Sequence, residues 1–110
     1  MVVGVPKETA AGERRVALVP ETVGRLAASG VSAVVEHGAG VEASFLDSAY
    51  HEAGAEIADP YVAEVVCKVQ KPSVEELDRL HEGSVLVGLA RGRGGGDLSD
   101  LVDAVVGKRV

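Results

Sequence analysis

The sequence is poor in cysteine and in aromatic residues: it contains one cysteine, no tryptophan, one phenylalanine and two tyrosines among 110 residues. A single thiol, Cys67, cannot form an intramolecular disulfide, which favours a reducing compartment. Long apolar runs are also missing, whereas a membrane span needs roughly 20 apolar residues. The N-terminus lacks the basic and apolar regions of a signal peptide. We therefore expect a cytoplasmic chain with no direct membrane insertion.

Basic residues are in the minority, with 11 Lys and Arg against 17 Asp and Glu, giving a net charge of −6. An acidic surface repels nucleic acid and anionic membranes, so we expect neither as a partner. The three histidines make no metal-ligand spacing with Cys67, and no nucleophile–base arrangement can be identified. Valines at 65, 66 and 69 instead predict that Cys67 is a buried, inert thiol. Neither a metal site nor a catalytic residue is predicted.

The composition favours a single α/β domain. Apolar residues make up 46% of the chain and aromatics 3%, so Val, Leu, Ile and Ala must form the core, and 14 glycines punctuate it. Short apolar runs predict strands at 2–5, 32–36, 55–58, 65–69 and 84–89. Alternating strands and helices joined by short connections predict a three-layer α/β/α fold, flavodoxin-like or Rossmann-like, with a mainly parallel sheet.

The predicted helices begin at Pro20, Asp47 and Ser73, and glycines at 30, 54 and 83 end them. Asp47 is predicted to cap its own helix. At the third helix Ser73 and Glu76 have the spacing of a capping box, and Leu77 and Leu80 are predicted to form its buried stripe. A fourth helix is predicted over 98–106.

One glycine pattern, Gly38-x-Gly40-x-x-Ala43, follows a strand and nominally fits a dinucleotide-binding fingerprint. A pyrophosphate needs the positive N-terminus of a helix directly after the glycines. Glu42 places a carboxylate there instead, and helical spacing resumes only at Asp47. We therefore interpret the segment as a turn and expect the domain to lack a dinucleotide fingerprint of its own.

Polar residues follow two of the predicted strands. Arg14 and Arg15 lie in a loop after the first strand, where open α/β sheets bind ligands, and an arginine there can grip a carboxylate or phosphate with two N–H groups. Lys68 and Gln70 alternate onto one face at the end of another strand. Arg15, Lys68 and Gln70 are the residues we expect to line a common cleft. Solvated surface arginines and an ordinary polar strand end would produce the same pattern.

Ordered blocks of sequence then indicate a family. The chain strongly resembles the N-terminal domain of the alanine dehydrogenase and transhydrogenase α-subunit family over residues 3 to 89. The matching blocks are GVPKET from Gly4, ERRVA from Glu13, PETV from Pro20, VEHGAG from Val35, ASFLD from Ala43, the 50–55 stretch, and CKVQKP from Cys67. The family's N-terminal domain is a parallel, layered α/β domain, as the strand pattern independently predicts.

The resemblance also bears on which branch of the family the chain follows. Alanine dehydrogenases carry a substrate-site lysine at the position of Gln70 and a histidine at the position of Arg91. Without those titratable groups, proton transfer to an imino or keto acid loses its obvious agents. Lys68 to Pro72 looks like the transhydrogenase version of this segment, while Arg15 is common to both branches. The transhydrogenase branch is therefore favoured.

The resemblance implies a role in a larger assembly. The intact component would bind NAD(H) and exchange hydride with NADP(H) on a partner component, the transhydrogenase β subunit, while a membrane component couples the exchange to proton movement. The 110 residues would be the N-terminal domain, the following NAD-binding Rossmann domain being absent. We expect a dimer in the intact protein, peripheral to the inner or plasma membrane, and an inactive chain in isolation. A non-catalytic interaction module or remnant, and the N-terminal half of an alanine dehydrogenase, are the alternatives.

The segment 90–97 departs from the family pattern. It contains the run RGRGGG from Arg91 to Gly96, which is flexible in composition and is atypical of this domain. One such copy on an acidic chain is weak support for RNA binding. A degraded or truncated gene product, or an alternative terminus, is the interpretation we favour, and DNA downstream without family-like coding sequence in any frame would contradict it.

Overall fold

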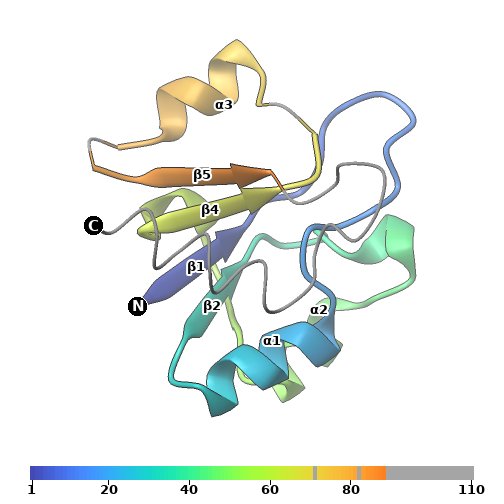
Figure 1. The fold of residues 1–110 in the computed structure, drawn as a ribbon. Helices are drawn as coiled ribbons and strands as arrows, with labels where there is room; N and C mark the ends of the chain where they lie inside the picture. The colour runs from blue at the N-terminus through green and yellow to red at the C-terminus, as the bar shows by residue number, and fades with distance from the viewer. Residues whose placement is uncertain (71, 82, 89–110) are drawn as a thin grey trace.

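A computed structural model describes residues 1–70, 72–81 and 83–88. They form a parallel five-stranded sheet in the order β3-β2-β1-β4-β5 (Figure 1). The strands are Val2–Val5 (β1), Ser32–Val35 (β2), Glu56–Ile57 (β3), Val65–Lys68 (β4) and Val85–Gly88 (β5). The predicted parallel α/β fold is confirmed, and the five predicted strands are all present.

The helices connect these strands in the expected order. They are α1 (Pro20–Ala28), α2 (Asp47–Glu52) and α3 (Val74–Arg79), with two short 3₁₀ turns, η1 (Val41–Ala43) and η2 (Pro60–Val62). The chain moves from β1 to β2 and β3 in one direction, and from β4 to β5 in the other. Right-handed crossovers in opposite directions place their helices on opposite faces of a sheet. Figure 1 shows α1 and α2 together near β2, and α3 next to β5.

The central strand β1 shows how the two faces are packed. Its Val3 and Val5 are fully buried in one apolar cluster with Val23 and Leu26 of α1. Gly4 points to the opposite face, where an added Cβ would lie 2.0 Å from the carbonyl oxygen of Pro60 in η2. A glycine is therefore required here, because η2 lies directly against the backbone of β1.

The same alternation determines where Lys68 lies. Gly4 is in register with Val66 of β4, so Val66 shares the face that η2 covers. Lys68 follows Val66 by two residues and belongs to that face as well. Cys67, between them, turns to the α1 face and is completely buried, as the valines around it predicted. Burial raises the pKa of its thiol to about 12.

Two helix predictions were wrong in detail. Leu77 is 49% exposed and Leu80 half-buried, whereas Glu76 is buried at 6% exposure, so the buried stripe of α3 is not the predicted leucine stripe. Glu76 instead faces inward, where its carboxylate accepts hydrogen bonds from Thr9 in the loop after β1 and from Lys68 at the end of β4. In α2, Leu46 occupies the N-cap position without a side-chain bond, and Asp47 is the first helical residue.

The capping box at α3 is confirmed. The hydroxyl of Ser73 accepts a hydrogen bond from the Glu76 amide, and the Glu76 carboxylate accepts one from the Ser73 amide. The predicted helix over 98–106 and the unusual 90–97 segment lie outside the described residues. Within the described part of the chain, no helix is long and apolar enough to cross a bilayer.

Candidate functional site

Polar side chains converge at the carboxyl ends of β1 and β4, the two neighbouring strands near the middle of the sheet. Open α/β sheets bind ligands at this end of their strands. From β1 the chain continues into the loop that carries Glu8 and Glu13, and from β4 it continues through Gln70 towards α3. The topology thus brings together residues about 60 positions apart in the sequence.

The inner layer of this region is a buried ionic group. The Lys68 ammonium donates to Glu8 at 3.1 Å and to Glu76 at 3.5 Å, and the Lys68 and Glu8 side chains are each only 2% exposed. Thr9 donates its hydroxyl to the same Glu76 oxygen at 3.0 Å. Burial alone would raise the pKa of Glu76, but hydrogen bonds from Ser73 and Thr9 and the Lys68 charge outweigh burial and lower it. A buried charge is tolerated only with such partners.

Glu8 has a second set of partners in the backbone. Its carboxylate accepts hydrogen bonds from the amides of Val69, at 2.8 Å, and Gln70, at 3.2 Å. Together with Lys68 this gives one carboxylate three donors on three successive residues. The loop after β1 is therefore attached directly to the end of β4.

The outer layer of the region is centred on Glu13. The Arg15 guanidinium donates to both Glu13 oxygens, each at 2.9 Å, and the Gln70 side-chain amide donates to one of them at 2.6 Å. Hydrogen bonds from Arg15 first and Gln70 second lower the pKa of Glu13 to about 2. The Arg15 side chain remains 60% exposed. The Glu13 side chain is only 6% exposed, so the exposed Arg15 and Gln70 hold its carboxylate between them just beneath the protein surface.

The three residues predicted to line a cleft are therefore in two layers. Arg15 and Gln70 meet on Glu13 at the surface, whereas Lys68 lies beneath them. Their place in a cleft stays a prediction. Arg14 is exposed and pairs with Glu42 at 3.1 Å, away from this group.

Glu8, Glu13 and Glu76 were not predicted as residues of this site. Each lies beside a residue or motif that was singled out, but a carboxylate in a polar loop is usually solvated. The one available signal for Glu76 was the capping box. It marks the residue as structural without showing that its carboxylate also reaches Thr9 and Lys68.

A hollow of about 330 Å³ opens beside the buried ionic group. It extends from the loop after β1 to α3, and its lining includes Lys7, Glu36, Tyr61, Glu76 and Arg79. The Arg79 guanidinium stacks over the Tyr61 ring at 4.2 Å. The Tyr61 hydroxyl is buried and, among the described residues, has no hydrogen-bond partner. Burial raises the pKa of this phenol to about 12.

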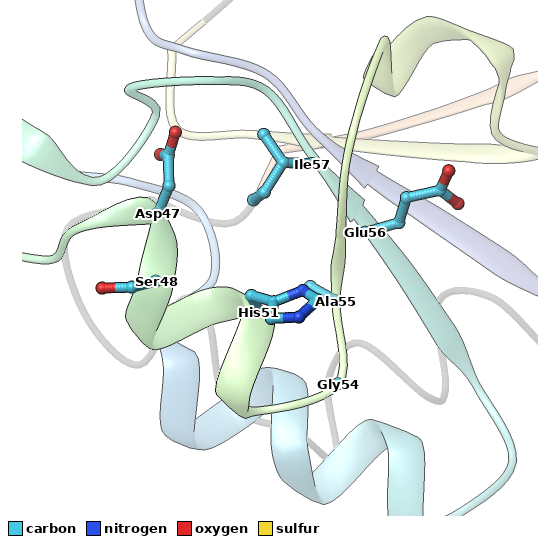
Figure 2. Close-up of a pocket in the computed structure, with 7 residues that line it drawn as sticks. All are labelled: Asp47, Ser48, His51, Gly54, Ala55, Glu56 and Ile57. Atoms are coloured by element: carbon cyan, nitrogen blue, oxygen red, sulfur yellow. The ribbon is translucent and has the colours of Figure 1, made fainter.

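A second hollow, of about 570 Å³, lies at the edge of the sheet between α2 and β3. Figure 2 shows Asp47 and His51 projecting from α2, with Glu56 and Ile57 across from them. The lining of this second hollow does not include the residues around Glu8 and Glu13. Within residues 1–70, 72–81 and 83–88 no three potential metal ligands gather, and the expectation that the chain binds no metal stays a prediction.

The glycine pattern after β2 forms a turn. Gly38 has a positive φ of 78°, and its amide donates to the Asp47 carboxylate at 2.9 Å. A Cβ on Gly40 would lie 2.7 Å from the Tyr50 ring, so this glycine allows a tight contact. Only the short η1 follows before α2 begins. The interpretation as a turn is confirmed.

Comparison with known protein families gives a match over most of the chain. The model of the family described as alanine dehydrogenase/PNT, N-terminal domain, covers residues 4–109. Among curated proteins, the NAD(P) transhydrogenase subunit α of Haemophilus influenzae is 42% identical over 90 residues, or 79% of this chain and 18% of that protein. The alanine dehydrogenase of Bacillus subtilis is 47% identical over 90 residues, or 78% of this chain and 24% of that protein. The chain thus spans about a fifth to a quarter of these relatives.

Solved structures agree with the sequence relatives. The crystal structure of transhydrogenase from Sinorhizobium meliloti superimposes with a TM-score of 0.77 at 35% identity, covering 81% of this chain and 28% of that one. An L-alanine dehydrogenase structure gives a TM-score of 0.76 at 34% identity, covering 96% of this chain and 30% of that one. Both groups of relatives are oxidoreductases by name, and similarity alone does not separate them.

Proposed function

Because the chain belongs to the alanine dehydrogenase/PNT N-terminal domain family, we propose that it serves as the N-terminal domain of the NAD(H)-binding component of a proton-translocating NAD(P) transhydrogenase. The choice of the transhydrogenase over the alanine dehydrogenase rests on the side chain of Gln70. A carboxamide is neither protonated nor deprotonated near neutral pH, so at this position it can donate and accept hydrogen bonds but cannot act as general acid or base. Its amide is already hydrogen-bonded to Glu13. This chemistry suits polar positioning rather than proton transfer to an amino or keto acid.

In this proposal the domain forms one wall of a cleft, and the nucleotide-binding domain forms the other. Arg15 and Gln70 present their donors at the surface of that wall, around Glu13. Lys68 lies beneath this surface, where its ammonium donates a hydrogen bond to the Glu8 carboxylate. Several charged and polar donors at the carboxyl end of a parallel sheet are suited to orienting a polar ligand.

The cofactor would be NAD(H), held mainly by a separate Rossmann domain, because the glycine turn at Gly38 provides no helix N-terminus for a pyrophosphate. NADP(H) would be held by a partner component, the β subunit, and the membrane component would act indirectly. Relatives from Haemophilus influenzae and Cereibacter sphaeroides are each named as an α subunit, which supports a place among several subunits. We propose a dimeric assembly, located in the cytoplasm at the inner or plasma membrane.

The alternative within the family is the N-terminal half of an alanine dehydrogenase. The 47% identity to the Bacillus subtilis enzyme favours it. A role as a non-catalytic interaction module is the alternative from another class. Alanine-dependent reduction of NAD⁺ would support the dehydrogenase, and partner binding without nucleotide-dependent activity would support the module.

The deciding experiment supplies the other components of the proposed assembly as separate proteins. The chain is mixed with an expressed NAD(H)-binding segment of a transhydrogenase α subunit and with the NADP(H)-binding component. Hydride transfer from NADH to an oxidised NADP analogue is then followed by absorbance. A parallel assay contains L-alanine and NAD⁺. Transfer that requires this chain, without alanine oxidation, is the expected result, and alanine oxidation would contradict the transhydrogenase assignment.

A matched variant tests the role of Gln70. Gln70→Leu removes the side-chain donor to Glu13, and we expect slower transfer with the chain still folded. Glu42→Gln alters a carboxylate paired with Arg14 elsewhere on the surface and serves as the control. Equal rates for both variants would show that Gln70 does not position anything in the reaction.

A further inference from the structure

The end of β4 is held by a side chain from the loop after β1, which lies 60 residues earlier in the sequence. The strand ends at Lys68, and the next two amides, of Val69 and Gln70, both donate to the Glu8 carboxylate. The Lys68 ammonium donates to the same carboxylate. Glu8 therefore binds three consecutive residues at the point where the chain leaves the sheet.

This arrangement constrains Gln70 through its own backbone. Hydrogen bonds at 2.8 and 3.2 Å on two consecutive amides fix the direction in which the chain turns. The Gln70 side chain then reaches Glu13 Oε1 at 2.6 Å, where Arg15 donates as well. If the turn rotated, the carboxamide would lose this contact, because its backbone would start from another direction.

We propose that Glu8 is the positioning residue of this site. Lys68 holds the Glu8 carboxylate in place, so that the Gln70 side chain is hydrogen-bonded to Glu13 next to Arg15. The inference rests on the proposed function, in which Arg15 and Gln70 form the surface of the cleft wall. Glu8 does not meet a ligand itself, because its side chain is 2% exposed. It acts through the backbone of residues 69 and 70.

A purely structural role for Glu8 would be simpler: one half of a buried ion pair that stabilises the whole domain. The two roles differ in what a shorter carboxylate does. Glu8→Asp keeps the charge opposite Lys68 but withdraws the oxygens by one methylene, so it weakens the contacts to the two amides. A structural role predicts lower stability and an unchanged Gln70 side chain, whereas a positioning role predicts a displaced Gln70 side chain in the folded protein.

The experiment uses NMR on the 110-residue chain, without nucleotide. The readouts are the side-chain NH₂ resonances of Gln70 and hydrogen exchange at the amides of Val69 and Gln70. In Glu8→Asp we expect the Gln70 NH₂ resonances to move towards those of a solvated carboxamide, and exchange at the two amides to accelerate by about tenfold or more. Glu36→Gln is the control, because Glu36 also accepts a backbone amide, that of Lys7, but is not hydrogen-bonded to residues 69 and 70.

A second variant removes the ion pair as a whole. Glu8→Leu and Lys68→Met are combined with Glu76→Gln, because Lys68 also contacts the buried Glu76 carboxylate, which would otherwise be left without its cation. Replacing all partners of a buried ionic group together is better tolerated than removing one. We expect the same displacement of Gln70. Folded variants with wild-type Gln70 resonances would overturn the proposal. Unfolding of both, under conditions where Glu36→Gln is folded, would also overturn it by assigning Glu8 to global stability.

The NMR experiment can be interpreted without knowing the enzymatic activity, so failure of this proposal and failure of the proposed function can be told apart. If hydride transfer is never observed but Glu8→Asp displaces Gln70, the proposed function fails and the positioning contact stands. If transfer requires Gln70 but Glu8→Asp leaves both Gln70 and the rate unchanged, the positioning role fails and the proposed function stands.

Discussion

The two tyrosines provide a matched test of how hydrogen bonding contributes to this fold. Both rings are buried, Tyr50 at 0% and Tyr61 at 3% exposure. The Tyr50 hydroxyl donates to the Leu18 carbonyl oxygen at 2.8 Å, whereas the buried Tyr61 hydroxyl has no partner in the described residues. Replacing each with phenylalanine removes one oxygen and keeps the ring. The two variants should therefore differ in the hydrogen bond alone.

Removing the Tyr50 hydroxyl leaves the carbonyl of the buried Leu18 without this donor. Loss of one partner of a buried hydrogen bond costs about 1–3 kcal/mol, so Tyr50→Phe should lower the free energy of unfolding by about 2 kcal/mol. For a domain of this size that corresponds to a decrease in Tm of roughly 10 °C. Tyr61→Phe removes a hydroxyl that was already desolvated without compensation, so stability should stay within about 0.5 kcal/mol of wild type or rise.

Urea unfolding followed by far-UV circular dichroism at neutral pH measures both effects, since the chain has no tryptophan for fluorescence. The midpoint should fall in Tyr50→Phe with an unchanged m-value and stay in place or rise in Tyr61→Phe. A loss in Tyr61→Phe as large as that in Tyr50→Phe would refute the reasoning. It would show that the Tyr61 hydroxyl has a partner or that ring packing dominates.

The same tyrosines determine a pH dependence. Burial raises the pKa of each phenol to about 12, from an ordinary value of 10. Above pH 10 the unfolded chain loses these protons while the folded chain retains them, so the stability of the folded state should fall as pH rises from 10 to 12. Replacing either tyrosine by phenylalanine should reduce the slope of stability against pH in that window. An unchanged slope in both variants would contradict the assigned burial.

Three further predictions concern packing, capping and reactivity. Gly4→Ala should destabilise the domain by about 3 kcal/mol in urea unfolding, because its Cβ would meet the Pro60 carbonyl. A Cβ at Gly88 would meet no atom of the described residues within 4 Å, so Gly88→Ala should change stability by less than about 1 kcal/mol. Equal effects of the two substitutions would contradict the close approach of η2. Ser73→Ala should lower the free energy of unfolding by about 1 kcal/mol through loss of the capping box, and an unchanged urea midpoint would argue against that box. Cys67, with its thiol pKa raised to about 12, should resist a thiol reagent at pH 8 until urea unfolds the chain, and labelling of the folded chain at the unfolded rate would show that it is accessible.

Much of the fold could be predicted from local patterns. The valine-rich runs at β1, β2 and β4 identified buried parallel strands because each is apolar on both faces and bounded by polar or breaking residues. Ser73 marked the start of α3 because a capping box is a local feature. The buried face of α3 was predicted wrongly from its apolar spacing, because the orientation of a helix only six residues long is determined by the residues it packs against.

The candidate site was less predictable because its contacts are long-range. Lys68 and Gln70 were singled out from their strand-end position, and Arg15 from its loop. The role of Glu8 was not predicted, because its three hydrogen-bond donors lie about 60 residues away in the sequence. A local pattern cannot distinguish a solvated glutamate from one that accepts several buried hydrogen bonds, because the difference depends on which strands become neighbours in the sheet.

The most direct test of the account is NADH binding by titration calorimetry. It compares the chain alone, a separately expressed NAD(H)-binding segment of a transhydrogenase α subunit alone, and the two together. We predict that the chain alone gives no heat of binding, and that the mixture binds NADH more tightly than the segment alone. Tight binding by the chain alone would contradict the expectation that the domain has no dinucleotide-binding site of its own. A mixture that binds no better than the segment, with the chain folded, would contradict its role as the opposite wall of a nucleotide cleft.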